Sequence, residues 1–329
     1  MSVLVKDADA VKLNNQTVDE IKDAQGNTLW NSHILEPTID NYTIEELAAI
    51  SDYLESIQDD DYENDPVYKD MKKFMEQGDV WASNSNGEQT GVTCYDAQSF
   101  NPAKANSDYL CNFGSSDARN NYVLLHIIGI LHDWKSDGTK AGLTLCPVKC
   151  IPFTRQYGAN GSNWASGTIR GQLQIGAELG GKFPTSITNY IKPVKKFYNG
   201  THSSSTQIGY TIDDMFLLSF SESYAVDFPS SLPAWYKNNG TGFEQTSTEG
   251  YVYEFFTKDP YTTSGTNAGQ NGIIAAKCYN NSGGGNGSAW SRSINYNAAS
   301  LGSYWSSSGS LLNNANLSTT YGVLPCFCI

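Results

Sequence analysis

Two stretches of the chain place apolar residues at helical spacing. In residues 43–57, four apolar residues recur at intervals of three, four and three: Leu47, Ile50, Leu54 and Ile57. Thr43 followed by Glu46 matches a capping box, so a helix is predicted to begin there. A second helix is predicted from Asp65-Pro66 to Gly78, with Val67, Met71, Phe74 and Met75 on one face. The narrow seam of the first helix favours packing on the second, with a contact between protomers as the alternative.

Other stretches have the pattern of strands. A nearly continuous apolar run over residues 122–131 predicts a central strand buried on both faces. Asp137-Gly138 then turns the chain back into a partner strand over residues 143–151. Residues 19–30 predict a small hairpin around Gly26-Asn27. Shorter apolar patterns predict strands at 192–198, 215–220 and 252–256, and short helices at 166–173 and 184–191.

Within these shorter elements, two side chains have predicted roles. Ser166 is expected to cap the helix over residues 166–173. Arg170, in the same helix, is expected to pair with a buried carboxylate, for which Glu222 is one candidate.

The last stretch, residues 286–329, differs in composition from the rest. Its two ends have the pattern of buried strands, and Arg292 is its single charged side chain. Between the ends lie Tyr, Trp, Ser, Asn and Gly, the residue types from which recognition surfaces are built. The composition fits a recognition surface on a rigid frame, and it also fits a solvated Ser/Asn-rich loop.

If the stretch is a recognition surface, its candidate ligand-binding residues are polar or aromatic and should be exposed. They are Ser291, Asn295, Tyr296, Asn297, Ser300, Ser303, Tyr304, Ser306, Ser308, Asn313, Asn314 and Asn316. The frame beneath them should be buried, and its predicted members are Trp164, Ile169, Phe216, Leu217, Trp290 and Phe327.

Composition excludes several classes of function. A net charge of −13 argues against a nucleic-acid partner, and no apolar run is long enough for a membrane span. The first residues lack the apolar core of a secretory signal, so none is expected. Seven cysteines without a matching Cys/His pair favour free, buried thiols over a zinc site. No catalytic or phosphate-binding motif is present, so we expect no enzymatic activity, metal ion or cofactor.

Three segments together resemble one family of uncharacterised C-type-lectin-like domains from gut bacteria and their phages. The first comprises residues 132–144 (HDWKSDGTKAGLT) and 163–173 (NWASGTIRGQL), and the second is residues 214–222 (DMFLLSFSE). The third is residues 290–293 (WSRS), with Ser308-Gly309 and the closing stretch 322–329. The chain departs from the family at Leu324, Pro325 and Cys326, and it has one Trp before the Arg instead of two.

The resemblance implies an α+β fold with a C-type-lectin-like domain at the C-terminus, preceded by a small N-terminal β-hairpin and two short helices. The implied domains are an attachment hairpin (1–35), a helical linker that could mediate oligomerisation (36–79) and a ligand-binding domain (80–329). Residues 286–329 would form its variable region, because such proteins are often targets of diversity-generating retroelements. The hairpin itself is similar to attachment segments of phage tail and baseplate proteins through its Ile21-Lys22-Asp23, Gly26-Asn27 and Leu29-Trp30.

The function implied is that of a phage tail-tip or receptor-binding protein. Its expected partners are a host cell-surface receptor (protein or glycan), other virion tail or baseplate proteins, and further copies of itself in a homotrimer. It would fold in the host cytoplasm and reside in the virion. The alternatives are a bacterial surface adhesin of the same fold and an enzyme of the formylglycine-generating type, which would use Cys326 or Cys328.

Overall fold

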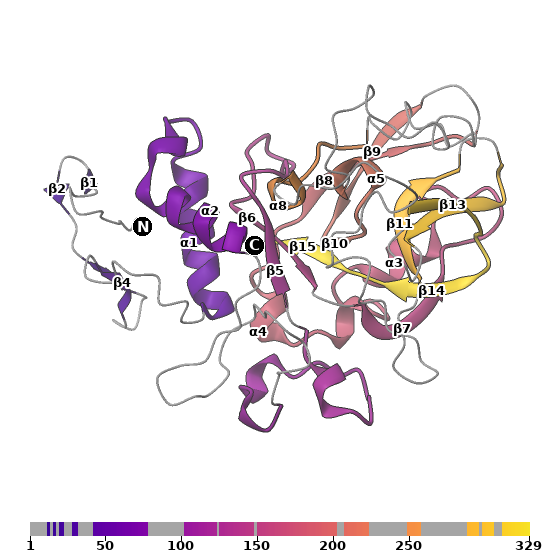
Figure 1. Ribbon diagram of the computed structural model, residues 1–329, viewed down its shortest axis with the longest axis horizontal. Helices are drawn as coiled ribbons and strands as arrows, with labels where there is room; N and C mark the ends of the chain where they lie inside the picture. The colour runs from indigo at the N-terminus through magenta and orange to yellow at the C-terminus, as the bar shows by residue number, and fades with distance from the viewer. Residues whose placement is uncertain are drawn as a thin grey trace.

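The computed structural model describes the chain in segments, within which the fold is mixed α/β (Figure 1). The described residues are 12–13, 16–17, 20–22, 28–31, 42–77, 102–123, 125–147, 150–202, 207–223, 249–257, 288–295, 298–305 and 311–329. For the described residues up to 31, and for 76–77, 104, 256–257 and 311–313, the description covers the backbone alone.

A four-stranded antiparallel sheet forms the centre of the molecule. Its order is β10 (Met215–Phe216), β15 (Cys326–Cys328), β6 (Leu143–Pro147) and β5 (Leu125–Ile130). All residues of these four strands are buried, as the continuous apolar run of β5 predicts. The closing strand of the sequence thus lies inside the sheet, between two segments from much earlier in the chain.

A five-stranded sheet carries most of the C-terminal stretch. Its order is β13 (Leu311–Asn316), β12 (Leu301–Trp305), β11 (Ala289–Ile294), β14 (Thr320–Val323) and β7 (Ile151–Gln156). The pair β11–β14 is parallel, and the other neighbours are antiparallel. The predicted strand over 143–151 is therefore two strands, because the chain leaves the central sheet after Pro147 and enters this one at Ile151.

A third, two-stranded sheet pairs β8 (Val194–Asn199) with β9 (Ile208–Asp213). The helices of this part are short: α3 (Thr168–Leu173), α4 (Thr185–Thr188), α5 (Phe220–Ser223) and α8 (Glu254–Thr257). The single 3-10 turns are Tyr62–Asn64, Pro102–Lys104, Ser107–Tyr109, Ala118–Asn121 and Gly180–Lys182. Among the described residues, none of the helices combines the length and apolar character that a bilayer crossing requires.

Several local predictions are wrong. The stretch 215–220 holds only the short strand β10 before the chain turns into α5, and 252–256 enters helix α8 instead of a strand. Short apolar runs fit a buried helical turn as well as a strand. Helix α3 begins after Gly167 without a side-chain cap, because the Ser166 hydroxyl bonds to the Asn163 side chain instead.

The two predicted long helices are confirmed as α1 (Ile44–Ser56), with Thr43 and Glu46 forming the capping box, and α2 (Pro66–Gln77). They pack on each other, and they also cover the central sheet (Figure 1). Leu47 and Leu54 are fully buried within the chain, and the Ser51 hydroxyl bonds to the Ile329 carbonyl. The helices are therefore part of the main core, and within the apolar seam Ile50 and Ile57 are half-buried and keep some surface for a contact between protomers.

Within the first residues, only the backbone of short strands is described: β1 (Lys12–Leu13), β2 (Gln16–Thr17), β3 (Glu20–Lys22) and β4 (Thr28–Asn31). Antiparallel pairing of β3 with β4 confirms the predicted hairpin, whose Gly26-Asn27 turn lies outside the described residues. Gly78 and the glycines at 283–285 also lie outside them.

Candidate functional site

The C-terminal sheet presents one polar and aromatic surface. On β13, Asn314 and Asn316 are exposed while Ala315 between them is buried, as strand alternation requires. Tyr304 of β12 is half-buried and lies 3.4 Å from Asn314 through its hydroxyl. Its ring packs on that of Tyr321 of β14, with 4.7 Å between the ring centres. We call Tyr304, Asn314, Asn316 and Tyr321 the C-terminal face.

The predicted burial of the frame is confirmed. All six residues expected in it are fully buried: Trp164, Ile169, Phe216, Leu217, Trp290 and Phe327. Trp290 lies under the C-terminal face, with its ring 4.9 Å from the Tyr321 ring and its indole N–H donating to the Arg155 carbonyl at 2.7 Å. The two tyrosines of the face thus rest on a residue that cannot move without disturbing the core.

The predicted binding residues divide into exposed, half-buried and buried groups. Asn314 and Asn316 are exposed, and Ser300 and Tyr304 are half-buried. Three predictions of exposure are wrong, because Ser291, Asn295 and Ser303 are buried. Outside the described residues lie Tyr296, Asn297, Ser306 and Ser308, and of Asn313 only the backbone is described.

Local structure accounts for the burial of these three residues. The Ser291 hydroxyl donates to the Leu218 carbonyl at 3.1 Å, and the Asn295 side chain accepts from the Ala298 N–H at 3.1 Å. Ser303 precedes Tyr304 on β12, so its side chain points to the opposite, inner side of the strand. Composition could not distinguish these residues from exposed ones, because Ser and Asn serve both roles.

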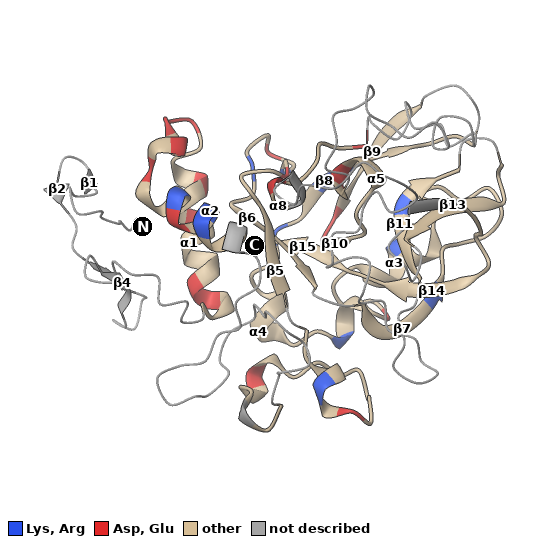
Figure 2. Ribbon diagram, viewed as in Figure 1, with Lys and Arg blue, Asp and Glu red and all other residues tan. Residues whose placement is uncertain are grey.

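Beneath the sheet, Arg292 is fully buried and makes four hydrogen bonds (Figure 2 shows how few charged residues the C-terminal strands carry). Its guanidinium donates to the carbonyls of Phe197, Leu217 and Glu249 at 3.0, 2.6 and 2.9 Å, and to the Glu222 carboxylate at 2.8 Å. The prediction that Arg170 pairs with a buried carboxylate is confirmed, but the candidate partner Glu222 is wrong. The partner is Asp213, which is fully buried and lies 2.6 Å from Arg170.

Lys196 extends the buried charge network. Its ammonium lies 2.6 Å from Asp133 and 2.7 Å from Glu222, and it also donates to the Tyr253 hydroxyl at 2.9 Å. Asp133 accepts further hydrogen bonds from the hydroxyls of Tyr253 and Thr144 at 2.8 and 2.6 Å. Both members of each buried ion pair are thus bonded to several partners, which is what makes buried charges tolerable.

The acidic groups of this network differ in pKa. Burial alone would raise the pKa of Glu222, but Arg292 and Lys196 hold it below its usual value. For Asp133, Lys196 likewise outweighs burial, and the pKa is lowered. Burial raises the pKa of Glu249 to about 7, because it outweighs the lowering of this pKa by Arg292 and by the hydrogen bonds from Ser293 and Asn199.

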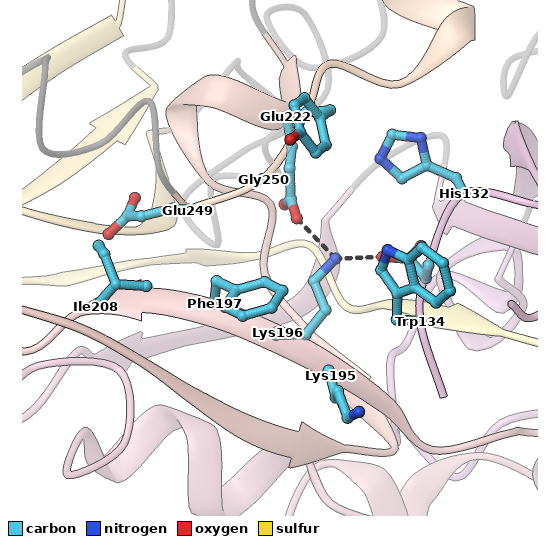
Figure 3. Close-up of a pocket in the computed structure, with 11 residues that line it drawn as sticks. His132, Trp134, Lys195, Lys196, Phe197, Ile208, Glu222, Glu249 and Gly250 are labelled. Atoms are coloured by element: carbon cyan, nitrogen blue, oxygen red, sulfur yellow. Dashed lines mark hydrogen bonds and ion pairs between the residues drawn. The ribbon is translucent and has the colours of Figure 1, made fainter. Parts of the chain in front are cut away.

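A cavity of about 480 Å³ lies beside this network (Figure 3). Its lining comprises His132, Asp133, Trp134, Lys195, Lys196, Phe197, Ile208, Glu222, Glu249, Gly250 and Tyr251. These residues come from the loop after β5, from the β8–β9 hairpin, from helix α5 and from residues 249–251. Sequence reasoning missed the cavity, because its walls come from segments far apart in the chain.

The cysteines that are described, Cys111, Cys146, Cys150, Cys326 and Cys328, are all free and buried, as predicted for them. Burial raises the pKa of the Cys326 and Cys328 thiols well above the usual value. Within the described part of the chain, no group of three or more His, Cys, Asp or Glu side chains is placed to hold a metal ion.

Comparison of the chain with protein-family models, with curated proteins and with solved structures gives no match.

Proposed function

We propose that the chain is a receptor-binding protein of a phage tail, in which a C-type-lectin-like frame presents the C-terminal face to a ligand on the host cell. The observation that carries the proposal is a group of partly exposed aromatic and polar residues that rests on a buried frame. Tyr304, Tyr321, Asn314 and Asn316 are half-buried or exposed, the Trp290 ring that packs on Tyr321 is fully buried, and Arg292 on the same strand as Trp290 is fully buried as well. Rigid aromatic residues among small polar ones are typical of recognition surfaces.

The arrangement of the strands supports the lectin-like part of the proposal. The closing strand β15 lies inside the central sheet, and the strands that bear the face lead directly into it. A surface strand anchored in this way keeps its backbone when exposed side chains change. Frames of this kind suit a surface that varies in sequence.

Diversification by a retroelement is part of this proposal, and it predicts which positions should vary. Retroelement-directed change of adenines would convert Asn codons mainly into codons for Tyr, Ser, Asp, Gly, Ala, Ile or Thr. Diversified positions should include Tyr304, Asn314 and Asn316 and should exclude the buried Ser291 and Arg292. Sequencing the DNA beside the gene tests this, because a template repeat should differ from residues 286–329 only at adenines of the exposed positions.

The alternative of a bacterial adhesin uses the same face and differs in where the protein is displayed. Neighbouring genes for tail assembly favour the phage protein, whereas genes for secretion or anchoring favour the adhesin. The cysteine-based enzyme is less favoured, because burial and a raised pKa keep the Cys326 and Cys328 thiols protonated and out of reach.

The function is tested by competition for the host surface. Purified protein added to host cells before the phage should occupy the receptor and lower the rate of phage adsorption in proportion to its concentration. Protein unfolded by heat and cooled serves as the control. A rate of phage adsorption that does not change with saturating folded protein would contradict the proposed receptor binding.

A further inference from the structure

The cavity beside the charge network is a second candidate site, apart from the C-terminal face. None of the residues that line it belongs to that face, and none lies in the stretch 286–329. Its volume of about 480 Å³ is in the range of pockets that hold small ligands. The inference below concerns this cavity alone and stands independently of the function proposed for the face.

The charges at the cavity are unbalanced. Three carboxylates lie within or against the network, those of Asp133, Glu222 and Glu249, and all three residues are at most 4 % exposed. Two cations, Lys196 and Arg292, are buried with them, and both are committed to Asp133 and Glu222. Among the described residues, the Glu249 carboxylate accepts from neutral donors alone, the Asn199 N–H at 3.0 Å and the Ser293 hydroxyl. Within this part of the chain, the five ionised groups of the network therefore carry one more negative charge than positive charge.

The walls of the cavity carry aromatic rings that other described residues leave accessible. Trp134 is 44 % exposed and Tyr251 is 84 % exposed, and Phe197 lies on the neighbouring strand β8. In Figure 3, the Trp134 and Phe197 rings lie on either side of the Lys196 side chain, and Glu249 lies beyond Phe197. Aromatic faces attract cations through their quadrupole, above all where water is excluded.

We propose that this cavity binds an alkylammonium group, which its aromatic walls would surround and whose charge would balance the Glu249 carboxylate. The group can belong to a free small molecule or to a lysine-type side chain of a peptide. In both cases the positive charge, more than the apolar body, decides recognition.

The other charged groups around the cavity permit a cation. Burial lowers the pKa of His132, so its ring is neutral at pH 7. The ammonium of Lys195 lies over the Tyr210 ring at 5.9 Å, and Figure 3 shows its side chain directed away from Glu249. Lys140 lies over the Trp134 ring at 5.2 Å and is not part of the cavity lining. Burial raises the pKa of Tyr157, and the nearby Glu249 raises it further, so its hydroxyl is neutral.

Choline and its uncharged isostere, in which carbon replaces the quaternary nitrogen, test the proposal. Each is titrated into the full chain at constant ionic strength, with tryptophan fluorescence and calorimetry as readouts. We expect choline to bind at least about tenfold more tightly than the isostere. The third probe is lysine that is acetylated at its α-amino group and carries a C-terminal methylamide, so that only its side-chain ammonium is free. It reports whether a peptide side chain enters as readily as a small molecule.

Binding should also depend on pH, because Glu249 must lose its proton to balance the ligand. With a pKa of about 7 for Glu249, the ionised fraction and hence the affinity for choline should rise about tenfold from pH 6 to pH 8. Glu249→Gln should weaken choline binding and abolish this dependence. Trp134→Ala should weaken binding at every pH, and Ile175→Ala, an exposed apolar residue outside the cavity lining, is the matched control.

Three results would overturn the proposal. Equal affinity for choline and the isostere would show that the cavity selects apolar bodies. Failure of choline and the lysine derivative to bind would show that it takes no ammonium group. Binding that survives Trp134→Ala unchanged would place the ligand elsewhere, and this variant decides the matter even if Glu249→Gln fails to fold.

Discussion

Replacing Arg292 by Met tests the frame most severely. Arg292 is fully buried, and its four hydrogen bonds join β11 to the carbonyls of Phe197, Leu217 and Glu249 and to the Glu222 carboxylate. Removing one partner of a buried ion pair costs about 3–5 kcal/mol, because the other charge stays buried without compensation. Lys196 still neutralises part of the Glu222 charge, but the carbonyls of Phe197, Leu217 and Glu249 lose their donor. We therefore expect a loss of about 3–5 kcal/mol in the free energy of unfolding.

Urea unfolding followed by tryptophan fluorescence measures this loss. Arg119→Met is the matched control, because Arg119 makes the same kind of ion pair with Asp117, at 2.8 Å, on the exposed surface. The control should leave the urea midpoint unchanged. A midpoint for Arg292→Met as high as that of Arg119→Met would refute the argument that Arg292 holds the frame together.

A double-mutant cycle shows whether Arg292 acts through Glu222. Glu222→Gln should be destabilising in the natural chain and much less so when Arg292 is already Met, since the charge it removes has then lost its main partner. Equal costs in the two backgrounds would mean that the pair is not coupled.

Three further predictions concern the core, its acidic network and its helices. Trp164→Ala removes a fully buried ring and the indole donor to Asp213, so it should lower the free energy of unfolding by about 3–5 kcal/mol. Trp134→Ala should lower it by a small fraction of this, and equal losses in urea unfolding would contradict the assigned burial. Glu249 has a pKa of about 7 in the folded chain, against an ordinary value of 4.5, so between these two pH values the folded state holds a proton that the unfolded state has lost. The free energy of unfolding should therefore fall by on the order of 3 kcal/mol as pH rises from about 4.5 to about 7. Glu249→Gln should flatten that slope, and a slope that persists would assign it to other groups. Gly142→Ala should loosen α1 and lower the melting temperature, because a Cβ there would lie 2.6 Å from the Ser51 Cα. Gly171→Ala in α3 meets nothing within 4 Å and should stabilise the chain by about 0.5–1 kcal/mol; a melting temperature that Gly142→Ala leaves unchanged or raises would mean that α1 is not docked on β6.

Elements with a strong local pattern are predictable from this sequence. The capping box and periodicity of α1, the apolar face of α2 and the continuous apolar run of β5 all occur where expected, because each is set by neighbours in the chain. Burial of Trp290 and Phe327 was predictable for the same reason. The helices at 254–257 and 220–223 were not, because a single turn of helix and a short strand have the same apolar composition.

The candidate sites were predictable only in part. Asn314 and Asn316 lie on a strand of alternating exposure, and once the strand is known their exposure follows. Ser291 and Ser303 show the limit of composition, since a buried serine looks the same in sequence as an exposed one. The cavity depends on Trp134, Phe197 and Glu249 meeting across more than a hundred residues of sequence, and only tertiary structure brings them together.

The most direct test of the proposed function asks where the protein binds. Tyr304→Ala combined with Asn314→Ala removes the centre of the C-terminal face, while Leu110→Ala removes an exposed apolar side chain outside this face and serves as the control. Fluorescently labelled protein bound to host cells is counted for each variant, with urea midpoints measured in parallel to confirm folding. We predict that the double variant folds and no longer binds, while the control binds as the natural chain does. Full binding by a folded double variant would contradict the assignment of the C-terminal face as the receptor-binding surface.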